Sequence, residues 1–492
     1  MNSDYNFNLN NGYNKGQTIK NLGSTINANN ISVDANTLNI KSSNLNAKEN
    51  IGLNAVENVN ILATNDLTYQ DTQTSSKGFL SKKTQRDMIY KEDVVSSNLN
   101  AKNILINSDK DITLEATKLK AQDNIGVFAK EGDVNILAKE YKEGELHQTS
   151  KSSWGGLKKS VDIKSSDALK LNSALLETQA ANVVITSGKD INILASEINS
   201  GADIQLKALE NVLIASQSEY LKTREVHEKS SFNLKGLTGL LGSDENIYSK
   251  ELTKNDKLSS SSVSSSLNAK KDIIVDSGST TIIGSNLEAN NIEIKADTGE
   301  INILSSQDVQ NSNYLNKKLG IGLISAEKGI TQNFKDMFSG ETKIKFEVGR
   351  LEMSEFDKST QSVINNSSNL KARENLILDS LSDINVVGSN LKSDSNLVLN
   401  SQIGDINILN SIDTLNEDIK EKSFKASVSA TVQNEYVEIG SAVKNAIESA
   451  KQLKEVKEDY SNYKGEVKKL ENTLSDLKQR YKNINSKTCQ LI

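Results

Sequence analysis

The side chains best suited to nucleophilic or acid–base chemistry are few in this chain of 492 residues. It contains two histidines, His147 and His227, and one cysteine, Cys489, near the end. Each histidine stands alone among charged residues, and no serine or cysteine nucleophile can be paired with it, so we expect exposed side chains rather than a general base. We expect Cys489 to be a thiol of an unstructured tail, residues 487–492, or to pair with another chain. No catalytic residue is assigned.

Two glycine-rich stretches are similar to phosphate-binding loops but lack the rest of such a motif. Residues 236–242 read GLTGLLG and residues 320–322 read GIG. No Lys-Ser/Thr follows either stretch and no βαβ unit surrounds them, so we interpret both as hairpin tips. The sequence also lacks clustered Cys and His for zinc and the nonapeptides that bind calcium, so it predicts no metal and no cofactor.

Composition excludes several other classes of protein. The chain has no proline, which a collagen or polyproline stalk needs, and its single cysteine cannot form a disulfide scaffold. No stretch approaches the ~20 apolar residues of a membrane-spanning helix. The net charge of −6 is spread along the chain, which argues against a nucleic-acid partner.

A short phrase of the form apolar–Asn–apolar–Leu recurs along the chain. Apolar residues two apart lie on one face of a strand while the Asn points away, so each phrase predicts a half-buried strand. The phrase occupies residues 59–62, 134–137, 191–194, 301–304 and 406–409.

The residues around these phrases repeat as well. Triplets of aliphatic residues recur after 19 to 22 positions. The matching triplets are Ile26, Ile31, Leu38 with Leu45, Ile51, Val59; Leu99, Ile104, Ile112 with Leu119, Ile125, Val134; Leu176, Val183, Ile191 with Ile198, Ile204, Val212; Leu267, Ile273, Ile282 with Leu287, Ile292, Ile301; and Leu370, Leu376, Ile384 with Leu391, Leu397, Ile406.

A period of about 20 residues with three short strands is what one coil of a parallel β-helix requires. We therefore predict an all-β chain whose residues 24–425 form a right-handed parallel β-helix with like residues stacked at ~4.8 Å. Turns rich in Asn, Asp, Ser and Gly join the strands. Their Asn side chains either stack into ladders or are simply solvated, and the sequence leaves both alternatives open.

Longer segments interrupt the coils near residues 63–95, 138–172, 215–265 and 305–366. Each reads as alternating polar residues, then Ser and Lys, then Gly beside a large apolar residue, then a returning strand. This order predicts four β-hairpin arms outside the helix, with the glycines at the tips or bends.

The two ends of the chain differ from the repeats. We expect residues 1–23 to be disordered or frayed. Residues 426–486 predict a long helix, because apolar residues in 439–484 follow spacings of three and four that form a coiled-coil seam. Such a helix pairs with itself or another chain, or packs back on the β-helix.

Residues 182–193, NVVITSGKDINI, and residues 151–157, KSSWGGL, resemble the haemagglutinin repeat of two-partner secretion exoproteins. These are the filamentous haemagglutinins and contact-dependent growth inhibition toxins of Gram-negative bacteria. The resemblance covers roughly residues 20–425. It implies a secreted, surface-attached rod that mediates adhesion or carries a C-terminal toxin, an outer-membrane transporter as partner, and a receptor or target outer membrane.

The sequence departs from the family at both ends. No signal peptide or secretion domain precedes the first coil, and Val56-Glu57-Asn58 is followed by Val59 rather than the Asn of the pretoxin motif. We therefore expect a fragment, a degenerate locus or a spare cassette. Two other functions are alternatives: a β-helix carbohydrate lyase or hydrolase, which needs clustered carboxylates, and a trimeric autotransporter stalk, which needs a membrane barrel.

Overall fold

A computed structural model describes residues 2–9, 11–233, 246–322 and 343–433. Within these ranges the regular structure is β throughout, apart from one turn of 3₁₀ helix, η1 (Trp154–Gly156). The prediction of an all-β chain is confirmed. The long helix predicted for 426–486 falls outside the described residues except for 426–433.

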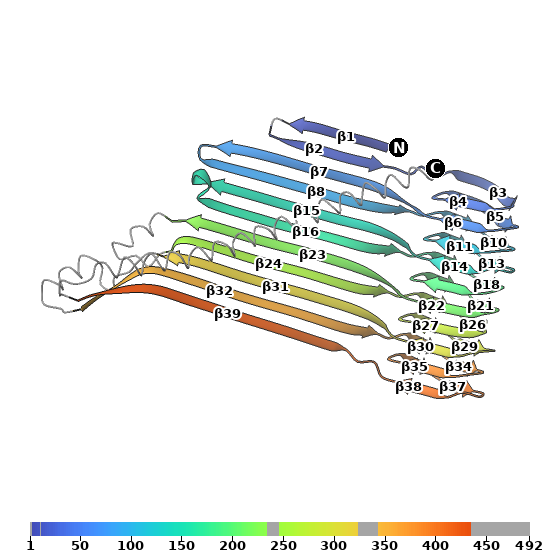
Figure 1. Cartoon of the computed structure of the whole chain (residues 1–492). Helices are drawn as coiled ribbons and strands as arrows, with labels where there is room; N and C mark the ends of the chain where they lie inside the picture. The colour runs from blue at the N-terminus through green and yellow to red at the C-terminus, as the bar shows by residue number, and fades with distance from the viewer. Residues whose placement is uncertain (1, 10, 234–245, 323–342, 434–492) are drawn as a thin grey trace. The chain divides into compact units, whose positions relative to one another are not determined.

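Short strands stack in parallel in three columns, in chain order (Figure 1). Columns one and two form an 18-stranded sheet and column three a 10-stranded sheet. β3 (Thr25–Ala35) and β5 (Asn44–Ala55) span the first two columns. The rest of column one is β9 (Asn98–Ala101), β12 (Lys118–Ala121), β17 (Leu175–Thr178), β20 (Glu197–Ser200), β25 (Ser266–Ala269), β28 (Asn286–Ala289), β33 (Asn369–Ala372) and β36 (Asn390–Ser393).

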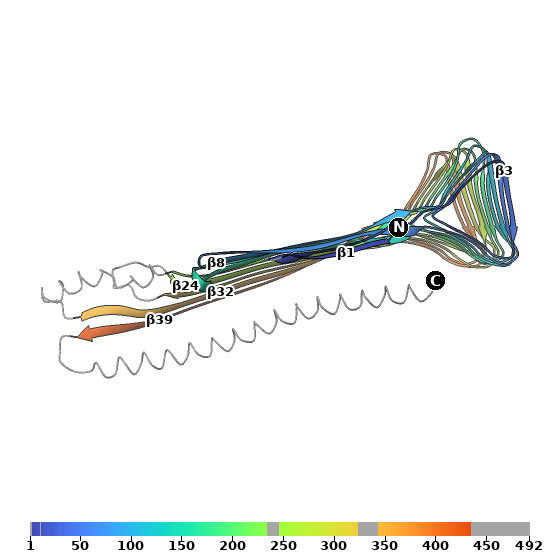
Figure 2. The same ribbon diagram turned by 90° about the horizontal axis from the view of Figure 1, so that it is seen from above.

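Columns two and three continue each coil. Column two is β10 (Asn103–Ser108), β13 (Ile125–Ala129), β18 (Val183–Ser187), β21 (Ile204–Ala208), β26 (Asp272–Ser277), β29 (Asn291–Ala296), β34 (Asn375–Ser380) and β37 (Asn396–Ser401). Column three is β4 (Leu38–Lys41), β6 (Val59–Leu62), β11 (Ile112–Glu115), β14 (Val134–Leu137), β19 (Ile191–Leu194), β22 (Asn211–Ala215), β27 (Ser279–Ile283), β30 (Ile301–Leu304), β35 (Ile384–Val387) and β38 (Ile406–Leu409). Figure 2, seen from above, shows these coils superposed.

The register of the columns confirms the aliphatic triplets with one exception. Four of the five sets pair residue for residue, as Leu99 does with Leu119. In the remaining set, which begins with Leu267, Ile301 pairs with Thr280 rather than with Ile282, which pairs with Ile303. Thr280 is fully buried and shares a hydrogen bond of 2.8 Å with Ser277 Oγ. A hydrogen-bonded hydroxyl therefore occupies a core position at which the repeat predicts an aliphatic side chain.

The inward residues of the strands form one continuous apolar core. Ile191 and Ile193 of β19 are fully buried, and Ile193 lies between Ile136 and Ile214 of the coils on either side. The same alternation of buried and half-buried residues occurs in most coil strands. Stacking thus gives each coil the apolar contacts that a coil lacks by itself.

Asparagine ladders run along the outside of the coils. On three successive rungs of one ladder, Asn396 Nδ2 donates to Asn375 Oδ1, Asn375 to Asn291, and Asn291 to Asp272, each at 2.8 Å. The Asn of the recurring phrase also forms rungs, as in Asn192 to Asn135 at 3.0 Å. For these residues the structure selects the ladder over independent solvation, because in-register stacking brings identical amides within hydrogen-bond reach.

The arms join into one sheet. Their 11 strands lie in the order β1 (Asn2–Leu9), β2 (Gly12–Ile19), β7 (Thr64–Gly78), β8 (Ser81–Val95), β15 (Lys139–Ser153), β16 (Lys158–Asn172), β23 (Gln217–Phe232), β24 (Asn246–Val263), β31 (Ser306–Gly322), β32 (Lys343–Asn366) and β39 (Thr414–Gln433). Pairing is antiparallel within hairpins and also between them, as for β8 with β15. Sequence analysis predicts the hairpins but not the seams, by which we mean the backbone pairing between strands of neighbouring hairpins.

One arm strand accompanies each coil. A hairpin leaves after every second strand of column three, so one coil sends out a strand and the next receives the returning one. Strands in a sheet are about 4.8 Å apart, which is also the rise of one coil. The arm sheet and the coils therefore advance at the same rate, and this equality allows neighbouring hairpins to pair edge to edge.

Coils that do not send out an arm turn tightly instead. At the residue after column three, each such coil has a backbone with positive φ, between 45° and 56°. A left-handed residue reverses the chain directly into the next coil, and glycine adopts that conformation at no steric cost. The five positions are Ser42, Ala116, Ala195, Gly284 and Gly388.

Buried hydroxyls close the base of three hairpins. Ser265 Oγ donates to Ala215 O at 2.8 Å. Ala215 lies where β23–β24, the third hairpin from the coils, departs, and Ser265 lies where it returns. Ser97 and Ser368 make the equivalent bonds to Leu62 O and Leu304 O at 2.9 and 2.7 Å. All three serines are fully buried, so each hydroxyl has a backbone carbonyl as its hydrogen-bond partner in place of water.

The structure differs from the expectations for both ends. Residues 2–9 and 12–19 lie in the 1–23 segment expected to be disordered or frayed, but they form the hairpin β1–β2, whose second strand pairs with β7. An existing sheet edge supplies backbone partners that a polar segment lacks alone. Residues 426–433 continue β39 rather than beginning a helix.

The described residues fall into two compact units. The second contains residues 231–233, 246–250, 318–322, 343–354 and 423–433, which are parts of β23, β24, β31, β32 and β39. Within it, Lys425 Nζ lies 3.1 Å from Glu352 Oε1 and Arg350 Nη2 donates to Asn246 Oδ1 at 3.2 Å. All other described residues belong to the first unit.

Replacing Ile193 by Ala tests the stacked core. Ile193 is fully buried between two isoleucines, so Ile193→Ala should lower the free energy of unfolding by about 2–5 kcal/mol. Leu209→Ala, at a side chain 74% exposed, should change it by less than about 0.5 kcal/mol. Denaturant unfolding followed by circular dichroism measures both. Equal effects would mean that Ile193 does not lie in a core.

Replacing Gly284 by Ala tests the tight turn of the armless coils. Gly284 has φ +54°, and an added Cβ would lie 2.5 Å from Ser306 Cβ. We expect a loss of at least about 1–2 kcal/mol from the left-handed backbone alone. Gly52→Ala is the matched control, since its added Cβ meets nothing within 4 Å. The account of the turn fails if thermal unfolding shows Gly284→Ala to be as stable as Gly52→Ala.

Candidate binding surfaces

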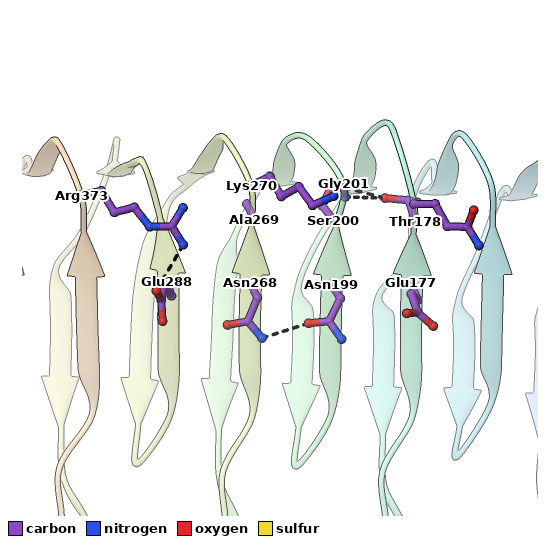
Figure 3. Close-up of a pocket in the computed structure, with 11 residues that line it drawn as sticks. Glu177, Thr178, Asn199, Ser200, Gly201, Asn268, Ala269, Lys270, Glu288 and Arg373 are labelled. Atoms are coloured by element: carbon purple, nitrogen blue, oxygen red, sulfur yellow. Dashed lines mark hydrogen bonds and ion pairs between the residues drawn. The ribbon is translucent and has the colours of Figure 1, made fainter.

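A shallow groove of about 570 Å³ crosses the edge of five successive coils (Figure 3). Gly201 contributes no side chain at the corner between columns one and two, where Gln179 and Lys270 line the groove on the neighbouring coils. Asn268 Nδ2 donates to Asn199 Oδ1 at 2.9 Å along one wall. The groove is lined by Glu177, Thr178, Gln179, Asn199, Ser200, Gly201, Asn268, Ala269, Lys270, Glu288 and Arg373.

The carboxylates of this groove do not meet. Glu177 pairs in register with Asn199, Asn199 with Asn268, and Asn268 with Glu288, which places the two glutamates three strand spacings apart, or roughly 14 Å. Glycosidases hold their two carboxylates about 5–9.5 Å apart. Hydrogen bonds from Lys371 and Arg373 lower the pKa of Glu288 and keep it ionised, whereas a general acid needs a raised pKa.

Both histidines lie on the arm sheet at seams between successive hairpins. His147 Nδ1 of β15 lies 2.8 Å from Asp87 Oδ1 of β8, and His227 Nδ1 of β23 contacts Asp162 Oδ1 of β16. The hydrogen bond with His147 lowers the pKa of Asp87. His147 is 56% and His227 50% exposed by side chain, and their partners are carboxylates rather than nucleophiles. Their geometry is that of hydrogen bonds between a histidine and a carboxylate on neighbouring hairpins.

A buried ion pair lies within β7–β8, the first of the four hairpins that leave the coils. Arg86 donates to both oxygens of Asp71, at 2.9 and 2.8 Å, and the two side chains are only 11% and 5% exposed. Tyr13 and Tyr69 also donate to Asp71, at 3.3 and 3.4 Å. Burial raises the pKa of Tyr69 to about 12, and the hydrogen bonds to Asp71 raise the pKa of Arg86. The cluster locks β2, β7 and β8 together.

The third hairpin repeats this device. Arg224 of β23 donates to both oxygens of Asp256 on β24, at 2.8 and 3.2 Å. Burial raises the pKa of Asp256, but hydrogen bonds from Arg224 and Lys254 outweigh it and lower the pKa overall. The sequence does single out Arg86 and Arg224, because arginine is scarce in the chain and both arginines lie in predicted arms.

The tips of the first two hairpins expose large apolar side chains. Phe79 is 96% and Trp154 60% exposed, and Leu80 and Leu157 beside them are also exposed. The two tips touch, since Gly155 N donates to Leu80 O at 3.4 Å. Gly155 and Gly156 lie at a tip as expected, whereas Gly320 and Gly322 lie inside β31. There, an added Cβ on Gly320 would meet Asn246 Nδ2 at 2.5 Å, so close packing explains that glycine.

Other predicted features lie elsewhere in the chain. Cys489 and the glycines of 236–242 are outside the described residues. In the described ranges, no three His, Cys, Asp or Glu side chains are grouped to hold a metal ion. Those same ranges contain no helix with the length and apolar character needed to cross a membrane.

Breaking the Arg86–Asp71 pair should destabilise the first hairpin. Arg86→Met leaves a buried carboxylate without its partner, so we expect a loss of about 3–5 kcal/mol in local stability. Lys392→Met removes an exposed partner of Asp394 and should cost less than about 1 kcal/mol. Hydrogen exchange of β7 and β8 amides reports the difference. Unchanged protection in Arg86→Met would contradict the role given to this pair.

Comparison with known proteins agrees with the repeated architecture. The hemagglutinin repeat family matches residues 79–174, 172–321 and 351–474, which together make up well over half of the chain. No curated protein and no solved structure matches it. The first two matched stretches contain alternating coils and hairpins of the kind described above. The chain therefore belongs to the hemagglutinin repeat family.

Proposed function

We propose that this chain is a non-enzymatic structural and adhesive segment of a secreted exoprotein at the surface of a Gram-negative bacterium. Its family is typical of secreted and cell-surface exoproteins, which supports that location. The observation that carries the proposal is the in-register stack of coils with an apolar core from Ile31 to Val386. Such a stack gives length and a long accessible surface without a closed site.

The finer architecture is part of the same proposal. The coils form a right-handed parallel β-helix with three strands per coil, since parallel crossovers are right-handed in almost all proteins. Buried ion pairs and hydroxyls stiffen the arms, so that the arm sheet presents fixed loops to a partner. Rigid presentation lowers the entropy lost on binding.

The proposal includes partners that the family resemblance suggests. An outer-membrane two-partner secretion transporter exports the protein. A cell-surface receptor or a target outer membrane is the attachment point, and a C-terminal toxin is the cargo in members that deliver one. The proposal also includes self-association through residues 439–484, where the apolar spacing in the sequence predicts a coiled-coil seam. No nucleic acid takes part, because the charge of −6 is unfavourable for it.

A carbohydrate lyase or hydrolase is the alternative, and the groove geometry does not favour it. Its two glutamates are about three strand spacings apart, and Glu288 is already bound to Lys371 and Arg373. A hydrolase needs a raised carboxyl pKa beside a second carboxylate.

Binding of the purified chain to intact cells tests the adhesive role. Labelled protein should bind Gram-negative bacteria or animal cells saturably, and excess unlabelled protein should displace it. A thermally unfolded sample is the control. The absence of saturable binding to both cell types would contradict adhesion. Release of sugar fragments from polysaccharides by the folded chain would favour the enzyme instead.

A further inference from the structure

The tips of the first two hairpins carry positive charge without compensation. Six lysines surround them, and no Asp or Glu occurs in residues 72–86 or 148–161. All six side chains are exposed, and none forms an ion pair with any described residue. These lysines are Lys77, Lys82, Lys83, Lys151, Lys158 and Lys159.

Some of these lysines lie directly opposite one another. Lys77 pairs in register with Lys82 across the first hairpin, and Lys83 pairs with Lys151 across the seam to the second. Like charges at directly opposed positions of a sheet destabilise it. Elsewhere in the same sheet, charged side chains have partners of opposite sign, as Lys170 has in Glu143 and Arg86 has in Asp71. The tips thus concentrate a repulsion that an anionic partner would relieve.

The backbone of the tips holds apolar side chains in water. Leu80 and Trp154 have positive φ, 59° and 55°, a conformation that non-glycine residues rarely adopt. Phe79 and Trp154 are two of the most exposed large apolar residues of the arms. Backbone strain, charge repulsion and apolar exposure occur together at one place, and strained residues cluster where a protein binds.

A partner for this surface must combine negative charge with an apolar interior. A soluble phosphate satisfies the lysines but offers nothing to Phe79 and Trp154. Basic residues around aromatic and leucine side chains are the composition by which proteins bind the interface of an anionic bilayer. Lysines reach the headgroups while the rings enter the boundary with the acyl chains.

We propose that the paired tips formed by residues 77–83 and 151–159 are a docking site for an anionic phospholipid surface. The lysines contact headgroup phosphates, and Phe79, Leu80, Trp154 and Leu157 insert between the lipids. This site does not depend on the adhesive role proposed above, because a chain that fails to bind cells could still bind lipid vesicles.

Fluorescence of Trp154 gives a direct test, because it is the only tryptophan of the chain. The full chain is mixed with vesicles of phosphatidylcholine and phosphatidylglycerol. We expect a blue shift of the Trp154 emission and quenching by lipids with brominated acyl chains. Neither vesicles of phosphatidylcholine alone nor soluble glycerol phosphate should produce the shift.

Variants separate the charges from the apolar residues. The double variant Lys77→Gln/Lys82→Gln should weaken vesicle binding by roughly fivefold for each lysine removed. Added salt should reduce vesicle binding of the parent chain. Phe79→Ser should also weaken it. The matched controls on the coils, Lys130→Gln/Lys392→Gln and Leu209→Ser, should leave binding unchanged, with circular dichroism confirming the fold of every variant.

Three results would overturn the proposal. The first is Trp154 emission that stays that of a water-exposed indole with anionic vesicles. The second is equal weakening by the tip and coil lysine variants, which means a diffuse charge effect. The third is a shift with soluble glycerol phosphate alone or with an acidic protein but not with vesicles, which assigns the tips to a different partner.

Discussion

The whole structure depends on stacking identical backbone turns one strand spacing apart. A coil of about 20 residues has too few apolar side chains to form a core, but the coil above covers its inward face and the coil below covers the other. Ile136, Ile193 and Ile214 illustrate this, since each lies in register on the next. The same register aligns amides outside the coils, so that Asn192 donates to Asn135.

The arm sheet follows from the same spacing. Because one arm strand accompanies one coil, hairpins that are about 50 or more residues apart in sequence meet as neighbours and pair along their backbones, as β8 does with β15. The alternation of tight turns at residues such as Ala195 and Gly284 with departing hairpins keeps this ratio constant. Ser265 and Ser368 then fix the position at which a hairpin leaves.

Sequence could predict what repeats locally. The phrase INIL at 191–194 and its equivalents establish strand, face and period, and the glycines beside Trp154 establish a hairpin tip. It could not establish the seams between hairpins, because the polar residues of β8 and β15 contain no periodic signal for one another. The aliphatic spacing pairs Ile282 with Ile301, whereas Thr280 occupies that position, because a buried hydroxyl with a hydrogen-bond partner replaces an aliphatic residue there. The hairpin β1–β2 was missed because its support, the edge of β7, is distant in sequence.

The central claim is that each coil must keep one arm strand, and two deletions measure it by hydrogen exchange. Removing residues 97–116 takes out one coil and no arm strand, so β8 and β15 would then depart from a single coil. We predict that the amides between β8 and β15 lose protection while those of the coils keep it. Removing residues 97–173 takes out two coils and one hairpin, and should leave β8 protected by β23. Full protection between β8 and β15 after the first deletion would contradict the claim.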